Sequence, residues 1–184
     1  RIAEAIRAKI RETVRITASV GVAPNKFLAK IASDLNKPDG LTIIRPDEVE
    51  SFLRDLPVGK IHGVGPAAER RLHERDLRTV GDLAHRSREE LDRWFGSHGE
   101  WLFNISRGVD PRPVVRDRDA KSVSHERTFG RDVTDREHLR AIMLTQTEDV
   151  ARRLRRHAFR AKGITLKIRY GDFETITRAE TLDA

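Results

Sequence analysis

Cysteine is absent from the 184-residue sequence, so the chain has neither a disulfide framework nor a thiolate metal site. No apolar run approaches the roughly 20 residues that a bilayer span requires. Residues 1–12 are charged and lack the apolar segment and cleavage site of a secretory signal. These absences predict a cytoplasmic protein that makes no membrane contact.

Residue patterns typical of catalytic sites are absent as well. No nucleophile has an adjacent base, and the seven histidines form no pair at metal-ligand spacing on a helix. Two-metal phosphoryl transfer needs converging carboxylates, but the strands expected at residues 16–22 and 41–44 contain no Asp or Glu. The sequence therefore offers no catalytic residue and no metal ligand.

Positive charge is in excess, with 36 Lys and Arg residues against 29 Asp and Glu residues, a net charge of +7. The sequence pI is about 10.2. Such a balance attracts polyanions and makes nucleic acid the leading candidate partner. The alternative is a basic surface that serves only solubility.

The first 46 residues predict an amino-terminal helix followed by a strand, helix, strand unit. Apolar residues at every fourth position indicate a helix over residues 2–14. Short buried strands are expected at Ile16–Val22 and Leu41–Ile44, and Pro24 is expected to open the helix between them. A turn at residues 36–40 ends that helix. The residues expected on its inward face are Phe27, Leu28, Ile31 and Leu35.

Residues 47–108 predict a small all-helical domain. A short helix is expected from about Asp47 to Leu56, and beyond it two helices meet at a Gly-Val-Gly corner. Ser87 and Glu90 have the spacing of a capping box, and Gly108 ends the last helix.

Residues 109–120 contain two prolines and alternating charges, which indicates an extended tether. Residues 121–184 then predict a further domain. Lys121–Phe129 resembles a strand, and Thr134 with Glu137 is expected to cap a long helix.

Two more strands are expected after that helix, the second near residues 174–182. In the first, residues 164–170, apolar and polar side chains alternate, so one face is apolar and the other is basic. Lys167 and Arg169 lie on the basic face, which suits contact with a phosphate backbone or with solvent alone.

The glycine corner is the most informative motif. Gly63 and Gly65 allow a tight turn and leave room for a phosphate to approach the amides that open the next helix. Lys60 adds a positive charge beside them. The pattern resembles a helix-hairpin-helix motif, which binds the DNA backbone, although an ordinary turn between helices would give similar spacing.

Lys37 follows a helix end and precedes Pro38, a rigid position where a lysine could meet a phosphate. From the residues alone, a helix terminator with a solvated lysine is the preferred interpretation.

Four segments together resemble the Y-family DNA polymerases, in particular the bacterial DNA polymerase IV group. They are TASVGVAPNKFLAKIASDLNKPDG, LPVGKIHGVG, LRTVGDL and KIRYGDFETITRAETL. The resemblance implies an α+β fold: a partial palm of mixed sheet and helices (1–46), an all-helical thumb with a helix-hairpin-helix (47–108), a linker (109–120) and an incomplete little finger of βαββ form (121–184). It also implies that the chain starts after the catalytic acidic strand and stops within the little finger.

The resemblance also implies roles for individual residues. Lys37 matches a lysine that contacts the triphosphate of the incoming nucleotide. Gly63, Val64 and Gly65, with Lys60 nearby, match the thumb hairpin that holds the DNA backbone. Residues in two little-finger strands match phosphate contacts: Lys121, Ser124, Arg127, Lys167 and Arg169.

The implied function is template-directed DNA synthesis across damaged templates, with Mg²⁺ as cofactor of the intact enzyme. Its partners would be primer-template DNA, a deoxynucleoside triphosphate and a sliding clamp, and it would act as a monomer. The Mg²⁺ ligands have no counterpart in this chain, so we expect it to be inactive alone. The alternative is a non-catalytic helix-hairpin-helix DNA-binding module, and a third possibility is a basic protein with no nucleic-acid role.

Overall fold

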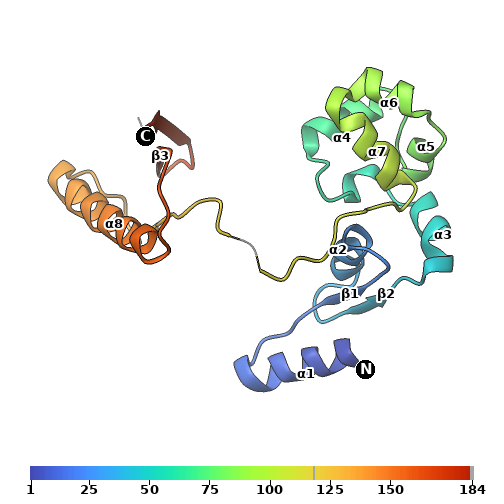
Figure 1. The fold of residues 1–184 in the computed structure, drawn as a ribbon, viewed down its shortest axis with the longest axis horizontal. Coiled ribbons are helices and arrows are strands. Elements are labelled where there is room, and N and C mark those ends of the chain that lie inside the picture. The colour runs from blue at the N-terminus through green and yellow to red at the C-terminus, as the bar shows by residue number, and fades with distance from the viewer. Residues whose placement is uncertain (118, 183–184) are drawn as a thin grey trace. The chain divides into compact units, whose positions relative to one another are not determined.

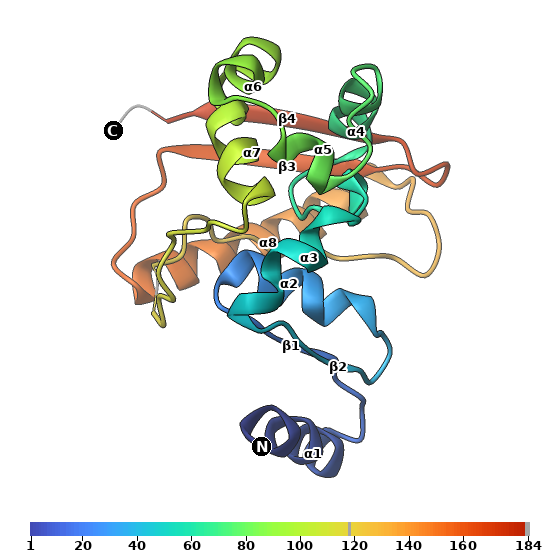
Figure 2. The same ribbon diagram turned by 90° about the vertical axis from the view of Figure 1, so that its right-hand side faces the viewer.

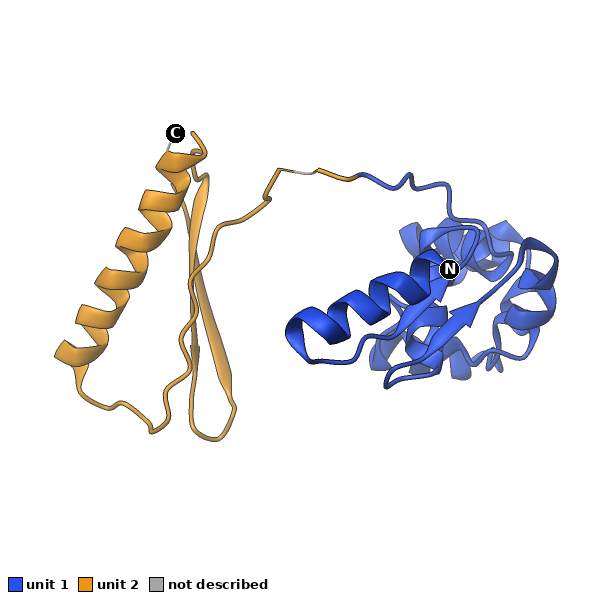
Figure 3. Ribbon diagram, turned by 90° about the horizontal axis from the view of Figure 1, so that it is seen from below, with its two compact units in different colours: residues 1–115 blue, residues 116–184 orange. Residues whose placement is uncertain are grey.

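The computed structural model describes residues 1–117 and 119–182. The chain divides into two compact units, residues 1–115 and residues 116–184 (Figure 3). None of the helices in the described residues combines the length and the apolar character that crossing a bilayer would need.

The first unit contains a parallel strand pair joined by a helix. Strand β1 (Val20–Val22) pairs with β2 (Leu41–Ile43), and helix α2 (Lys26–Leu35) crosses between them (Figure 1). A Cβ on Gly21 would lie 2.1 Å from the carbonyl oxygen of Ala29, so glycine lets the helix approach the strand this closely. The predicted strand, helix, strand order is confirmed, although β1 is shorter than predicted. We expected a mixed sheet here. In the described residues of this region, the sheet consists of this parallel pair.

Helix α2 begins at Lys26 and not at Pro24, because the side chain of Asn25 caps it by accepting a hydrogen bond from the Leu28 amide at 3.0 Å. Phe27, Leu28 and Ile31 are buried as predicted. Leu35 was expected to face inward but is 44% exposed, since it lies in the last turn beyond the packed surface.

Helix α1 (Ile2–Val14) forms where the apolar spacing predicted it. Its apolar stripe does not pack into the core: Ile2, Ile6 and Val14 are all at least half exposed. Figures 1 and 2 show the helix set apart from the β1–β2 pair, with the segment leading to β1 between them.

The helical region begins with a 3₁₀ turn at Pro46–Glu48 and helix α3 (Val49–Arg54), where the sequence predicted one continuous helix. The predicted capping box is confirmed, with the Glu90 amide donating to Ser87 Oγ at 3.2 Å and the Ser87 amide donating to Glu90 Oε2 at 2.8 Å. The remaining elements are a 3₁₀ turn at Val58–Lys60, α4 (Pro66–His73), α5 (Val80–Ala84), α6 (Arg88–Phe95), a 3₁₀ turn at Gly96–His98 and α7 (Gly99–Ser106).

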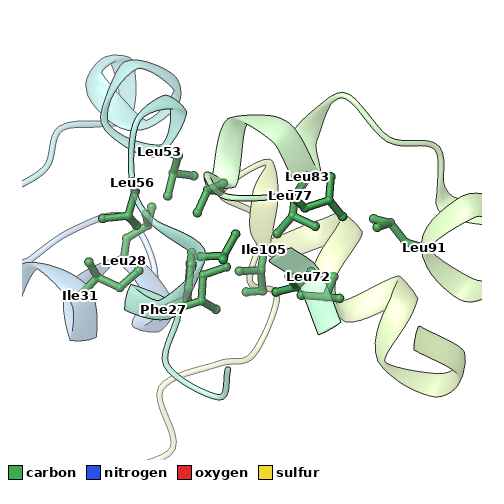
Figure 4. Packing of buried hydrophobic residues seen from close by; sticks show 14 of the residues in the cluster. Phe27, Leu28, Ile31, Leu53, Leu56, Leu72, Leu77, Leu83, Leu91 and Ile105 are labelled. Atoms are coloured by element: carbon green, nitrogen blue, oxygen red, sulfur yellow. The ribbon is translucent and has the colours of Figure 1, made fainter. Parts of the chain in front are cut away.

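One apolar cluster extends through the first unit, from helix α2 to helix α7 (Figure 4). It brings Leu28 of α2 together with residues of the helical region such as Leu53 and Leu56 (Figure 4). Burial of this surface is the main favourable contribution to the stability of the unit. The leucines with no exposed surface are Leu28, Leu77, Leu83 and Leu91.

The second unit consists of helix α8 (Arg136–Arg156) alongside an antiparallel hairpin of β3 (Gly163–Arg169) and β4 (Thr175–Thr181) (Figure 3). Both predicted strands are confirmed. The predicted cap of α8 is wrong: Asp135 and not Thr134 caps the helix, accepting hydrogen bonds from the amides of Glu137 and His138.

The strand predicted at residues 121–129 is not formed in the described residues. The segment meets α8 instead, where the Ser124 carbonyl accepts a hydrogen bond from Arg153 at 2.8 Å. Its backbone makes no bond to the backbone of β3, and without such a ladder an extended segment is not a strand. The α+β fold class is confirmed, whereas the first strand of the βαββ pattern is missing.

A matched pair of substitutions tests the core. Leu28→Ala should lower the free energy of unfolding by about 2–5 kcal/mol, because it removes a fully buried side chain and leaves a cavity. Leu35→Ala, in the same helix, should cost less than about 1 kcal/mol. Urea unfolding followed by circular dichroism measures both, and equal losses would contradict the assigned burial.

Candidate nucleic-acid interface

The glycine corner lies between the 3₁₀ turn at Val58–Lys60 and helix α4. Val58 and Ile61 before the corner, and Leu72 after it, are each at most 1% exposed. These side chains anchor both arms of the hairpin in the core. The first arm is a single 3₁₀ turn where the sequence predicted a helix.

The corner itself faces solvent, and Gly63 and Gly65 are both exposed. Among the described residues, none accepts a hydrogen bond from the backbone N–H of Gly63, Gly65, Ala67 or Ala68. The Val64 amide is occupied, since it donates to the Ile61 carbonyl at 2.9 Å. Free amides at a helix start are suited to bind phosphate oxygens.

The two glycines differ in what their positions require. Gly63 has a φ of +110°, and a Cβ there would also lie 3.2 Å from the Trp101 ring. Gly65 has extended backbone, with φ −88° and ψ 175°, and a Cβ there would meet nothing within 4 Å. The turn therefore requires glycine at position 63 only, whereas the sequence pattern suggested both.

Lys60 is exposed and has no carboxylate partner within 4 Å among the described residues. Its charge is therefore available to an anion beside the corner. Its predicted role in binding DNA stays a prediction, as do those of the three corner residues.

Lys37 lies in the turn that follows α2, and two arginines of α1 hold this turn. Arg7 bonds to the Asp39 carboxylate at 2.8 Å, and Arg11 pairs with the same carboxylate. Lys37 itself is 57% exposed and pairs with Asp34 at 2.5 Å. Hydrogen bonds from Lys30 and then Lys37 lower the pKa of Asp34 to about 2.

The other predicted contacts lie in the second unit. The register pairs Lys167 with Thr177 and Arg169 with Thr175, so these four side chains share one face of the hairpin. Lys167 lies 3.9 Å from the Glu126 carboxylate, and Arg169 Nε donates to Thr175 Oγ1 at 3.1 Å.

The segment before α8 contains the remaining predicted contacts. Lys121 and Ser124 are exposed, and the guanidinium of Arg127 lies 5.7 Å from the centre of the Phe129 ring. Glu126 brings this segment next to Lys167 of β3. The predicted contacts thus fall into two groups, one in each unit.

The sequence interpretation missed Asp110, which it placed in a tether. The Asp110 side chain is only 2% exposed. It accepts a hydrogen bond from the Phe27 amide at 3.1 Å, at the start of α2, and pairs with Arg112 Nε at 2.6 Å. Its pKa is lowered mainly by the Arg112 hydrogen bond.

Two neighbouring hydrogen bonds also join the segment around Asp110 to the start of α2. Asn25 Nδ2 donates to the Gly108 carbonyl at 2.7 Å, and Lys26 Nζ donates to the Pro113 carbonyl at 3.0 Å. Residues 108–113 therefore bind the start of α2. The partners are more than 80 residues apart, so no local pattern in the sequence could reveal them.

No group of three or more His, Asp or Glu side chains converges as a metal site within residues 1–117 and 119–182. The residues present therefore do not fit the two-metal site that the resemblance implies for the intact enzyme.

Three family models match the chain. Residues 1–34 match the impB/mucB/samB family, residues 54–110 match the "DNA polymerase-iota, thumb domain", and residues 120–184 match the impB/mucB/samB family C-terminal domain. The chain belongs to this family, the Y-family DNA polymerases. Y-family DNA polymerases generally use divalent metal ions.

Its relatives include proteins named DNA polymerase IV. The one from Alkalilimnicola ehrlichii is 47% identical over 97% of this chain and 50% of the relative, and the one from Methanoculleus marisnigri is 44% identical over 98% and 50%. The chain thus spans about half the length of these curated relatives.

Solved structures agree with this assignment. A Y-family polymerase chimera of Dbh and Dpo4 matches with a TM-score of 0.77 at 27% identity, covering the whole of this chain and 52% of the chimera. A ternary complex of Dbh matches with a TM-score of 0.63 at 27% identity, covering 100% of this chain and 54% of Dbh.

The two glycines provide a further matched test. Gly63→Ala should lower the free energy of unfolding by about 1–3 kcal/mol, because alanine is strained at this φ and its methyl group presses on Trp101. Gly65→Ala should change it by less than about 0.5 kcal/mol. Chemical denaturation measures both, and a larger loss at position 65 would refute the assigned geometry.

Proposed function

We propose that the whole protein is a template-directed DNA polymerase of the translesion type, and that this chain supplies part of its grip on DNA. The supporting observation is the exposed Gly63 corner, where neither the Gly63 and Gly65 amides nor Lys60 has a partner among the described residues. The similarity to proteins named DNA polymerase IV supports the activity.

The corner suits the sugar-phosphate backbone of duplex DNA. The amide N–H groups of Gly63 and Gly65 would donate to phosphate oxygens, and Lys60 would add a positive charge. Contacts of this kind position a duplex without reading its sequence. A polymerase needs this property, because it moves over every sequence that it copies.

Lys37 would contact the triphosphate of the incoming deoxynucleotide. Its ammonium group is held near the end of α2 by Asp34, and a triphosphate would compete with that carboxylate for it. We propose Mg²⁺ as the divalent ion of the whole protein. Since the described residues do not fit its site, we expect this chain alone to extend no primer.

The proposal extends to the protein's surroundings. The absence of cysteine supports a cytoplasmic location. A sliding clamp and a monomeric state are the partner and assembly that we propose for the whole protein, by analogy with its family.

Salt dependence tests the DNA grip. The affinity of this chain for a fluorescently labelled duplex should fall steeply between 50 mM and 200 mM salt, as measured by anisotropy, because phosphate contacts release counterions. Lys60→Ala should weaken binding to all sequences alike and reduce the salt slope by about 1. Lys9→Ala, on helix α1, is the matched control and should change neither. Salt-independent binding of the duplex, or no detectable binding, would refute the proposed contact with the DNA backbone.

Lys37→Ala tests the nucleotide contact in the whole protein. Losing one charge-assisted contact should raise the KM for deoxynucleoside triphosphates about tenfold or more. Duplex affinity should stay unchanged, because the corner is untouched. Steady-state primer extension gives the KM, with Lys9→Ala again as the control. An unaltered KM would exclude the proposed role.

A further inference from the structure

A cavity of about 400 Å³ opens beside the glycine corner, between the start of α2 and the helical region. Pockets that hold small organic ligands occupy about 300–1,000 Å³, so one such group fits. The cavity is lined by Lys26, Phe27, Lys30, His62, Gly63, Trp101 and Arg112.

The lining is strongly basic. Lys26, Lys30 and Arg112 contribute positive charge, and no carboxylate is among the described residues that line the cavity. Lys30 and Arg112 each pair with a carboxylate outside the lining, Asp34 and Asp110 respectively. These two cations are therefore partly neutralised.

Lys26 differs from them. Its ammonium group donates to the uncharged Pro113 carbonyl at 3.0 Å, and no carboxylate of the described residues lies within 4 Å of it. A carbonyl leaves the charge in place and two of the three N–H donors unused. Lys26 is accordingly the group in this cavity that an anion would neutralise.

Trp101 adds an aromatic ring to the lining of the cavity. Trp101 is half-buried, and the atoms at the edge of its six-membered ring lie 3.2 and 3.3 Å from where a Gly63 Cβ would be. An edge of the ring therefore lies against Gly63. An indole face is a platform on which a nucleic-acid base stacks, and such stacking tolerates any base.

We propose that this cavity binds one unpaired nucleotide, with its base against Trp101 and its phosphate facing Lys26. A duplex keeps its bases stacked within the helix, so a base that enters a cavity must come from an unpaired strand or a free nucleotide. The site therefore differs from the corner amides, which serve a duplex backbone. The two share Gly63 alone, and this proposal does not require the corner to bind DNA.

Tryptophan fluorescence tests the proposal directly. The chain has two tryptophans, so Trp94→Phe leaves Trp101 as the single reporter. Titration with deoxyadenosine monophosphate and with a short single-stranded oligodeoxyadenylate should each give saturable quenching. Deoxyadenosine without phosphate should bind at least about tenfold more weakly. Pyrophosphate should displace the nucleotide without quenching by itself.

The two ligand sources give different outcomes. Tighter binding of the oligonucleotide than of the monophosphate assigns the site to an unpaired strand, and equal binding assigns it to a free nucleotide. Saturable quenching by neither, or equal quenching by the phosphate-free nucleoside, overturns the proposal.

Charge removal gives a second readout. In the Trp94→Phe background, Lys26→Gln should raise the Kd for the nucleotide about tenfold, because it removes the positive charge and keeps a polar side chain. Lys9→Gln is the matched control and should leave the Kd unchanged. Superimposable unfolding curves show that the variants are folded, and an unchanged Kd for Lys26→Gln contradicts the proposal.

A crossed comparison separates this site from the duplex grip. Trp101→Leu should abolish the binding of unpaired nucleotides, measured by competition with a labelled oligonucleotide, and spare duplex affinity. Lys60→Ala should weaken duplex binding and leave the binding of unpaired nucleotides unchanged. If a folded Trp101→Leu variant loses both duplex binding and nucleotide binding, the two sites are not separate and the proposal is overturned. If every variant fails to bind duplex but the nucleotide results hold, only the proposed grip on duplex DNA is refuted.

Discussion

The left-handed backbone at Gly63 is the constraint on which both inferred binding surfaces depend. It forms the turn into α4, and the neighbouring amides have no acceptor among the described residues. Because this conformation favours glycine, no side chain at position 63 covers Trp101, and the ring lines a cavity. Buried Val58 and Ile61 fix the turn from below, and one glycine thus defines two adjacent surfaces of different chemistry.

A second connection joins the strand, helix, strand unit to the helical region. Asp110 is buried against the start of α2, where its charge complements the helix dipole and Arg112 neutralises it. Together with the continuous apolar cluster, this connection makes residues 1–115 one compact unit. The arrangement places Lys26 and the glycine corner on the rim of the same cavity.

Much of the fold could be predicted from the sequence, because the informative signals were local. The capping box at Ser87, the alternation before Tyr170 and the glycine corner each depend on residues within a few positions of one another. The errors arose where distant partners decide the outcome. Residues 121–129 have the composition of a strand but have no backbone partner among the described residues, and the role of Asp110 depends on Phe27, 83 positions away.

The same distinction applies to the candidate site. The corner residues and Lys37 were found through motifs, whereas the cavity joins residues from α2, the corner, α7 and the segment after it. Only the folded chain brings these together.

Asp34 has a consequence for which anions Lys37 can bind. The carboxylate lies between Lys30 and Lys37 and remains ionised at any ordinary pH, so the group of three carries one net positive charge. A singly charged anion gains little by replacing a carboxylate that is already in place. In the nucleotide contact proposed above, a triphosphate would bring several charges at once. If Lys37 contacts the triphosphate as proposed, this resting ion pair favours highly charged ligands over chloride or single phosphate groups.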